Sequence, residues 1–424
     1  LPGNSHVTCV NNVCTVCAQV PSGTPSYLVD PNSGSDVGGT GDNTTAGCAF
    51  RTIKRALQVI GTPLTATTIT VLGPATVNAG ETFPIVLPAN VSVTTTGGSV
   101  QVDVPAGVAG VNLSQIGTAI GGGTGAPLTI GGPHGGVNDA TFGIVVGTGT
   151  GVTTGNSPQV SEVRLTNFLN DGIIVQGTGI ARIGAGVTST LNGRAGLHVT
   201  DTGRAIVDVA SGATPTHFDA NSTHGVLVDS GGSIRITGTV TDATGGVSTV
   251  TTSRNFFAGV SIQQTAAAPP ANTITGLASF ASPNGNGIRI VAGSNVRVRD
   301  SISLNNQLSG VFVTTGGTTS NDISNIDLGT GVDAGGTFGG NTFQEPFSSP
   351  ARNTAAGVCL SVMPNAGSLH AAGNVFGAVN CATTAGTLTL DLGGCDNSMC
   401  TGGVCDLGIV TTTGNDIDVS MCGP

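Results

Sequence analysis

A short pattern of glycine followed by three residues, of which the first and third are aliphatic, recurs along the chain. The repeats begin at Gly143, Gly172, Gly196, Gly225, Gly259, Gly287, Gly310 and Gly357. Between the first and the seventh of these glycines, six intervals cover 167 residues, about 28 residues each. Side chains alternate between the two faces of a strand, so the aliphatic positions share one face. That face is predicted to lie in a core, while the middle residue, such as His198 or Arg289, points outward.

A second short strand follows several of these repeats, at 205–209, 233–236 and 295–299. A repeat of about 28 residues with two or three short strands and no helical periodicity is typical of a solenoid, in which stacked coils share one interior. The pattern therefore predicts an all-β fold, a parallel β-helix over residues 64–390. The usual preference of crossover connections makes it right-handed.

Asparagine stands four residues before five of the repeat glycines, at Asn192, Asn221, Asn255, Asn306 and Asn353. Stacked coils would place these amides above one another, where each side chain could hydrogen-bond the next. Alternatively, each asparagine forms its own turn, which the residue favours without any neighbour. Both interpretations fit the spacing.

The ends of a solenoid expose apolar side chains and need caps. Residues 49–60 place Phe50, Ile53, Leu57 and Ile60 on one helical stripe, and Gly61 ends the pattern. We expect a Cys-rich N-terminal extension at 1–25, an N-terminal cap at 26–63 with this amphipathic helix, and a Cys-rich C-terminal cap at 391–424.

Residues 26–75 carry a set of motifs found together in one family. They contain Tyr27-Leu-Val-Asp-Pro, then Gly34-Ser-Asp, then Phe50-Arg-Thr-Ile, and a later Thr-Ile-Thr-Val-Leu-Gly. This segment resembles the N-terminal signature of secreted right-handed β-helix proteins of the DUF1565-like type. Ala49 replaces the usual proline, and the tyrosine that closes the signature is missing. The resemblance implies the fold; some relatives carry polysaccharide lyase or hydrolase activity, and many have no assigned activity.

Ten cysteines form a group of four, up to Cys48, and a group of six, from Cys359. Both counts are even, so disulfides can staple each end. The alternative is zinc at Cys14-x-x-Cys17, but no second close pair has the spacing of a structural site. Disulfides indicate an oxidising compartment. Because the chain starts at Leu1, we expect an extracellular or cell-surface bacterial protein from which a signal peptide has been removed.

Charge and hydropathy limit the kinds of partner that we expect the protein to bind. The chain has 13 basic and 23 acidic residues, a net charge of −10, and its arginines do not cluster. Nucleic-acid binding needs a basic stripe and is not expected. No apolar run approaches the roughly 18 residues of a transmembrane segment.

Catalytic chemistry has only weak candidates. His198, His224, Asp208 and Asp229 lie in neighbouring repeats and could form a cluster, although isolated aspartates in glycine-rich turns usually only shape the turn. Hydrolases of this fold need two or three carboxylates around the bond that is cut. No such motif is found, and no cofactor is required.

A metal site is the other candidate. Asp30, Asn32, Asp36 and Asp42 lie in a glycine-rich loop, and hard oxygen ligands at this spacing suit calcium. The alternative is a loop of side-chain-stabilised turns that leads into the cap helix.

Two functions remain. The first is a non-catalytic extracellular structural or adhesive rod, which could assemble end to end into a homo-oligomer, a filament or a surface layer. Its support is the weakly charged surface and the outward apolar residues Ile174, Leu227 and Phe312. The alternative is a carbohydrate-active enzyme (a polysaccharide lyase or glycoside hydrolase) or a polysaccharide-binding protein. Such proteins use aromatic platforms, but aromatics make up 3% of the chain and tryptophan is absent. The sequence favours the first and leaves enzymatic activity open.

Overall fold

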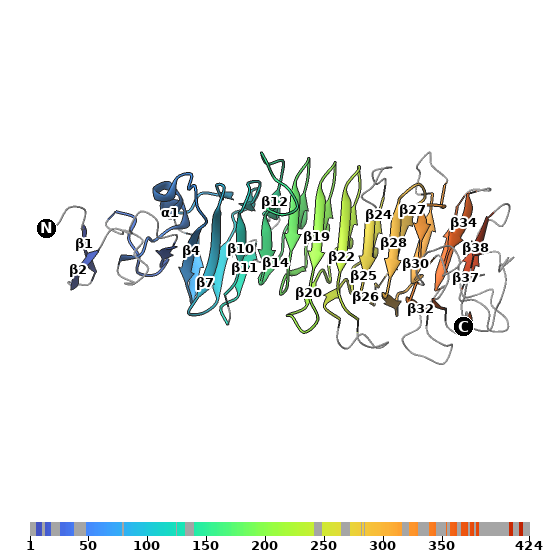
Figure 1. Ribbon diagram of the computed structural model, residues 1–424. Coiled ribbons are helices and arrows are strands. Elements are labelled where there is room, and N and C mark those ends of the chain that lie inside the picture. The colour runs from blue at the N-terminus through green and yellow to red at the C-terminus, as the bar shows by residue number, and fades with distance from the viewer. Residues whose placement is uncertain are drawn as a thin grey trace. The chain divides into compact units, whose positions relative to one another are not determined.

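The chain is almost entirely β-structure and divides into two compact units, Leu1–Ser189 and Thr190–Pro424 (Figure 1). The computed structural model describes residues 6–10, 13–17, 26–37, 48–78, 80–123, 125–131, 140–240, 248–263, 272–280, 282–283, 285–315, 322–329, 339–344, 353, 357–362, 366–371, 374–376, 379–380, 407–409 and 415–418. Within these ranges there is one α-helix, α1 (Ile53–Ile60), and it is too short to cross a membrane.

The first unit contains three parallel sheets after an antiparallel hairpin of β1 (His6–Val10) and β2 (Val13–Cys17). Sheet I has the order β3 (Ser26–Val29), β4 (Thr67–Leu72), β7 (Val91–Thr96), β10 (Ala119–Gly121), β13 (Gln159–Ser161) and β16 (Ile180–Ile183). Sheet II has β5 (Ala75–Val77), β8 (Val100–Asp103), β11 (Leu128–Gly131) and β14 (Val163–Thr166). Sheet III has β6 (Ile85–Val86), β9 (Ala109–Asn112), β12 (Phe142–Val146) and β15 (Asp171–Val175), and β17 (Thr188–Thr190) lies at the boundary of the units.

The second unit repeats this arrangement. Its sheet I has β19 (Arg204–Asp208), β22 (Ser233–Thr237), β25 (Asn272–Thr275), β28 (Val296–Arg299), β31 (Ile326–Asp327), β34 (Gly367–His370) and β38 (Asn415–Asp418). Its sheet II has β20 (Thr216–His217), β23 (Val250–Thr251), β26 (Leu277–Phe280), β29 (Ile302–Leu304), β32 (Thr342–Gln344), β35 (Val375–Phe376) and the antiparallel β36 (Val379–Asn380). Its sheet III has β18 (Ala195–Val199), β21 (His224–Val228), β24 (Ala258–Ile262), β27 (Asn286–Val291), β30 (Val311–Thr314), β33 (Val358–Ser361) and β37 (Leu407–Ile409).

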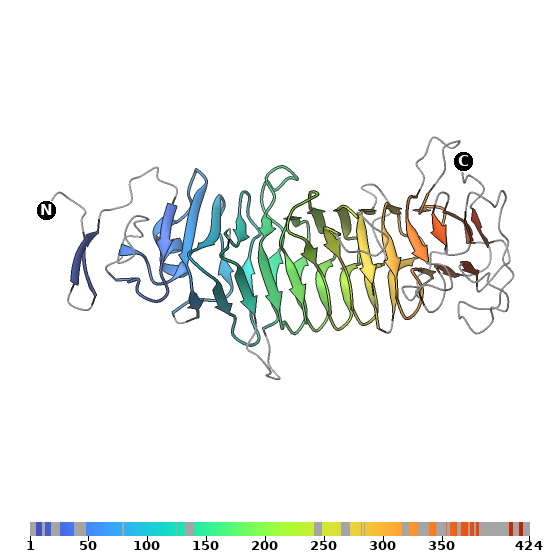
Figure 2. The same ribbon diagram turned by 90° about the horizontal axis from the view of Figure 1, so that it is seen from below.

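The chain visits the three sheets in turn, so each strand pairs with the strand three elements along, as β21 pairs with β24. Successive coils of each unit lie side by side (Figure 2). Each unit is therefore a right-handed parallel β-helix, as the repeat predicts.

The aliphatic positions of the repeat form the core. Leu197 and Val199 of β18, for example, pair with Val226 and Val228 of β21, and all four side chains are fully buried. The alternation of the sequence thus sets which face of each sheet III strand points inward.

The stacked asparagines hydrogen-bond one another within the second unit. Asn221 donates from its backbone nitrogen and from Nδ2 to Oδ1 of Asn255, over 2.9 and 3.1 Å. Asn192 and Asn221 repeat this pair of bonds, as do Asn306 and Asn353. The ladder interpretation is confirmed at these positions. Ser282 interrupts it, and its backbone nitrogen donates to Asn306.

Helix α1 is shorter than the predicted 49–60, because Thr52 is extended and caps it. The Thr52 hydroxyl accepts a hydrogen bond from the Arg55 nitrogen at 3.0 Å. Phe50 precedes the helix: its backbone bridges to Val29 and its ring stacks on Tyr27. The prediction that Phe50 lies on the helical stripe is therefore wrong; it joins the core through β-type pairing instead.

A disulfide joins Cys17 to Cys48, within the N-terminal group of cysteines as expected. Cys359 is also disulfide-bonded. Most of the predicted C-terminal cap at 391–424 lies outside the described residues.

Candidate functional site

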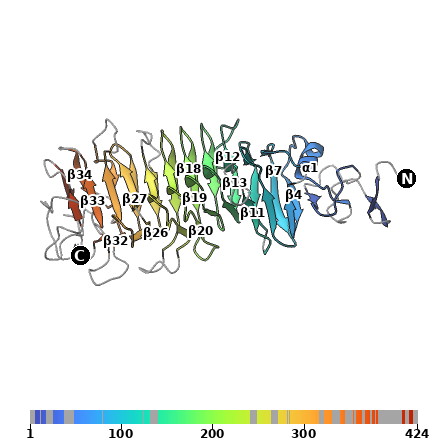
Figure 3. The ribbon, with the colours of Figure 1, turned by 180° about the vertical axis from the view of Figure 1, so that it is seen from behind.

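The outward positions of sheet III in the second unit form a row across neighbouring strands. His198 of β18 pairs in register with Leu227 of β21. Leu227 in turn pairs with Ser261 of β24, and Ser261 with Arg289 of β27. Figure 3 shows β18 and β27 in the view from behind. Parallel, in-register pairing therefore brings together polar groups that are up to 91 residues apart between positions 198 and 289.

His198 links a cation and an anion. Its Nε2 lies 3.2 Å from Oδ2 of Asp229, and Nη2 of Arg194 lies 2.6 Å from its Nδ1. Because a guanidinium can only donate, Nδ1 is the accepting nitrogen and the ring's proton is on Nε2, facing the carboxylate. His198 is 3% exposed, so this arrangement is fixed by its surroundings.

Asp229 keeps its negative charge in this setting. Burial alone would raise the pKa of its carboxyl, but hydrogen bonds from His198 and Thr200 outweigh burial and hold that pKa below its ordinary value. Asp229 therefore orients His198 as a carboxylate orients a histidine in many sites.

His224 lies beside this pair and stays neutral. Burial, and to a lesser extent the positive charges of Arg289 and Arg194, lower the pKa of His224 to about 4. Its Nδ1 is buried and makes no hydrogen bond within the described residues. Because this nitrogen is enclosed, it is not open to a molecule bound at the surface.

Arg289 completes the group, which we call the histidine face: Arg194, His198, His224, Asp229 and Arg289. Burial lowers the pKa of the half-buried Arg289 guanidinium, which nevertheless stays charged at neutral pH. Its Nη1 is 3.4 Å from the Ser261 hydroxyl, which also accepts a hydrogen bond from Gln263 at 2.8 Å.

Two phenylalanines border the histidine face. Phe256 and Phe257 are 43% and 50% exposed, and their rings meet edge to face at 4.9 Å. The ring of Phe257 also lies 6.1 Å from that of His224. The aromatic residues are few, but two of them form an exposed pair at this surface.

The structure thus brings together three of the four predicted candidates, His198, His224 and Asp229. Asp208 is on β19 in sheet I and pairs with Thr237, so it belongs to another face of the coil. The sequence pattern did not indicate four further residues of this surface: Arg194, Arg289, Phe256 and Phe257. The signal for Arg289 was its position: it occupies the same place in its repeat as His198.

The predicted calcium loop uses its oxygens within the protein. One carboxylate oxygen of Asp30 accepts hydrogen bonds from the backbone nitrogens of Asn32 and Ser33, at 2.9 and 3.1 Å. Asp36 binds the backbone nitrogens of Arg51 and Thr52, at 2.9 and 3.0 Å. These are the bonds of a turn and a helix entry, as in the alternative interpretation.

Asn32 donates from its side-chain amide to a backbone carbonyl, and Asp42 lies outside the described residues. The described residues contain no group of three or more His, Cys, Asp or Glu side chains arranged to hold a metal. Calcium binding stays a prediction.

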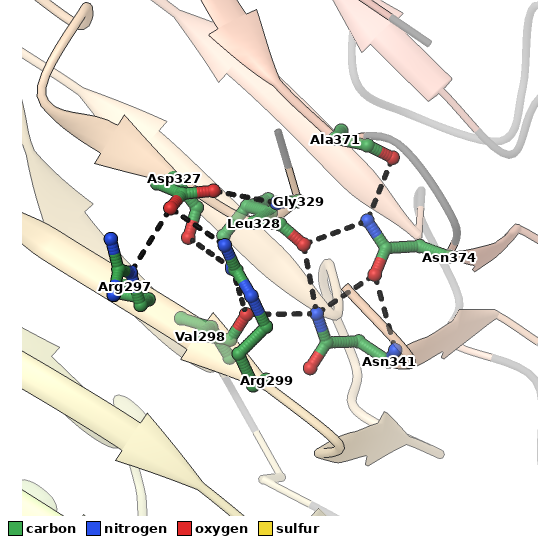
Figure 4. A network of polar contacts seen from close by, with 9 residues as sticks. All are labelled: Arg297, Val298, Arg299, Asp327, Leu328, Gly329, Asn341, Ala371 and Asn374. Carbon is green, nitrogen blue, oxygen red and sulfur yellow. Dashed lines mark hydrogen bonds and ion pairs between the residues drawn. The ribbon is translucent and has the colours of Figure 1, made fainter. Parts of the chain in front are cut away.

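A second polar network lies between sheet I and sheet II of the second unit (Figure 4). Nη2 of Arg299 lies 2.6 Å from Oδ2 of Asp327, and Nε of the exposed Arg297 lies 3.1 Å from the same oxygen. Asn341 and Asn374 continue it as a second amide ladder, with Nδ2 of Asn341 donating to Oδ1 of Asn374 at 2.8 Å. Arg299 is buried, whereas the Arg297 side chain is exposed. The network is internal and holds adjacent coils together.

A cavity of about 660 Å³ lies beside α1 in the first unit, walled by apolar residues that include Leu57, Ile85 and Leu87. Glu81 at its margin accepts hydrogen bonds from the nitrogens of Ile53 and Lys54, at 2.5 and 3.0 Å, and so caps α1. Burial raises the pKa of this carboxyl.

Comparisons with known proteins assign the chain to no family. No family model matches the chain, and no curated protein matches it. The resemblance to DUF1565-like proteins therefore stays a prediction.

Three solved structures are similar to the chain. The A-module of mannuronan C-5 epimerase AlgE4 from Azotobacter vinelandii has 12% identity and a TM-score of 0.49, with 92% of this chain and 99% of that chain covered. The AlgE6 A-module from the same organism has 11% identity and a TM-score of 0.30, with 86% and 92% covered. A GH136 lacto-N-biosidase from Eubacterium ramulus has 8% identity and a TM-score of 0.22, with 93% and 68% covered. At TM-scores below 0.5, they support no conclusion about the activity of this chain.

Proposed function

We propose that this chain is an extracellular saccharide-binding β-helix, and that the histidine face of the second unit is its binding surface. The observation that carries the proposal is the fixed polar row from Arg194 to Arg289 beside the exposed rings of Phe256 and Phe257. Sugars present hydroxyl groups at their edges and C–H groups on their faces. Planar polar side chains next to an aromatic ring match both kinds of surface.

This proposal replaces the structural rod as the favoured function. Two of the three apolar outward residues that suggested an adhesive surface are buried: Ile174 is 5% exposed and Leu227 is 7% exposed. The third, Phe312, is half-buried, so the three residues do not form a continuous exposed stripe. End-to-end self-assembly stays a prediction.

Hydrolysis is a poor match to the histidine face. Glycosidases of the usual kind use two carboxyl groups about 5 to 10 Å apart, whereas the histidine face as defined above includes one carboxylate, Asp229, beside His198.

The test is a binding screen of the folded protein against neutral and acidic polysaccharides, by affinity electrophoresis and calorimetry. Phe257→Ala should weaken binding of any positive polysaccharide by about tenfold, as loss of a central aromatic contact does. Leu64→Ala is the control, because Leu64 is 98% exposed in the other unit. Absence of binding to every polysaccharide, or equal binding by Phe257→Ala and the wild type, contradicts the proposal.

A further inference from the structure

Arg289 is a half-buried cation without an anionic partner. Within the described residues no carboxylate forms an ion pair with it, and its one hydrogen bond is a long contact of 3.4 Å to the Ser261 hydroxyl. Proteins rarely bury part of a charged group without pairing it, because desolvation disfavours the charge. Arg297 and Arg299 of the same unit show the usual solution, since both pair with Asp327.

The neighbours of Arg289 do not supply the missing charge. Its partners in register are Ser261 on one side and Phe312 on the other, and both are neutral. His224 is neutral as well, because its pKa is about 4. Asp229 is the ion-pair neighbour of His198 rather than of Arg289, and His198 accepts a hydrogen bond from the Arg194 guanidinium.

Arg289 therefore leaves on the histidine face a positive charge that forms no ion pair with a described carboxylate, although the whole chain has a net charge of −10. A local excess of positive charge on a half-desolvated surface attracts an anion more strongly than the same charge in open water. A cation is excluded from this position for the same reason.

Resting on the proposed function, we infer that Arg289 makes the histidine face selective for saccharides that carry an anionic group. A guanidinium forms paired hydrogen bonds with either a carboxylate or a sulfate. The charge of Arg289 acts on His224, and the ring of His224 lies 6.1 Å from that of Phe257. We expect the anionic group to bind at Arg289 while the sugar ring rests on Phe257.

The experiment compares matched pairs of polysaccharides. Polygalacturonate is set against its fully methyl-esterified form, and dextran sulfate against dextran, by calorimetry at fixed ionic strength. We expect the wild type to bind at least one charged member at least tenfold more tightly than its neutral counterpart, as a charge-assisted pair of hydrogen bonds provides. The first pair tests a carboxylate and the second a sulfate.

Variants identify the residue responsible. Arg289→Gln should lose at least tenfold of the preference for the charged member over its neutral counterpart, measured as the ratio of the two affinities of the same variant. Arg289→Lys should keep part of the preference because it keeps the charge. Arg235→Gln is the matched control, because Arg235 is an exposed arginine on sheet I of the same unit. Its binding should equal that of the wild type.

The outcomes separate this inference from the proposed function. If neutral polysaccharides bind in a Phe257-dependent way but charged ones are not preferred, the inference fails and the proposed function stands. Undiminished preference in Arg289→Gln also overturns it. If no polysaccharide of either kind binds, both fail.

Discussion

Replacing Asn255 by alanine should remove the central rung of the amide ladder in the second unit. Asn255 is completely buried and makes three hydrogen bonds through its side chain. Its Oδ1 accepts from the backbone nitrogen and from Nδ2 of Asn221, and its Nδ2 donates to the carbonyl of Phe218 at 2.9 Å. The alanine variant leaves all three partner groups buried without these bonds.

The magnitude follows from what is left behind. Each buried polar group that loses its partner costs about 1 to 3 kcal/mol. Because three groups lose a partner and the coil can relax in part, we expect the free energy of unfolding to fall by roughly 3 to 5 kcal/mol. The loss should exceed that of an ordinary surface substitution several times over.

Urea unfolding followed by circular dichroism, together with limited proteolysis of the second unit, measures this change. Asn295→Ala is the control, because the Asn295 side chain is only half-buried and has no hydrogen bond of its own within the described part of the chain. Its effect should stay within about 1 kcal/mol. A decrease of less than about 1 kcal/mol for Asn255→Ala would refute the claim that the ladder holds the coils together.

Three further predictions concern single positions. Gly225→Ala should destabilise the second unit strongly, since an added Cβ would lie 2.5 Å from the Phe218 carbonyl oxygen. Gly155→Ala should change the melting temperature little, because the nearest atom to its added Cβ would be the Thr153 hydroxyl oxygen at an ordinary contact distance of 3.9 Å; equal effects would contradict this. His224 has a lower pKa in the folded state than in the unfolded chain, so its contribution to the free energy of unfolding is intact above about pH 6.5. About 3 kcal/mol of that free energy is lost as the pH falls towards 4. The free energy of unfolding of His224→Gln should vary less with pH over this range, and an unchanged slope would exclude His224 as the cause. Glu81→Ala should remove the hydrogen bonds to the backbone nitrogens of Ile53 and Lys54 and lower the free energy of unfolding by about 1 to 2 kcal/mol. Thr82→Ala serves as the control. Equal hydrogen-exchange rates of the α1 amides in Glu81→Ala and the wild type would show that the cap is unimportant.

Much of the fold could be predicted because its causes are local and periodic. Glycine followed by alternating aliphatic residues sets which side chains point inward on β18, β21 and β24, and the repeat length sets how the coils stack. The offset of Asn221 and Asn255 from their glycines allowed either a ladder or independent turns, and the side-chain hydrogen bond between the two residues decides for the ladder. The start of α1 was wrong because Phe50 satisfies a helical stripe and a β-bridge equally well, and only its pairing with Val29 decides between them.

The histidine face depends on strand register and on burial, and neither can be predicted from a single segment of the sequence. The sequence by itself determined that residues such as His198 and Arg289 point away from the core, since side chains alternate along a strand. Only the tertiary structure decided that His198 meets Asp229 and that Asp208 lies on another sheet. It also decided that Arg289 pairs with no carboxylate within the described residues. The partners of a charged side chain here come from neighbouring coils, which lie tens of residues away along the chain.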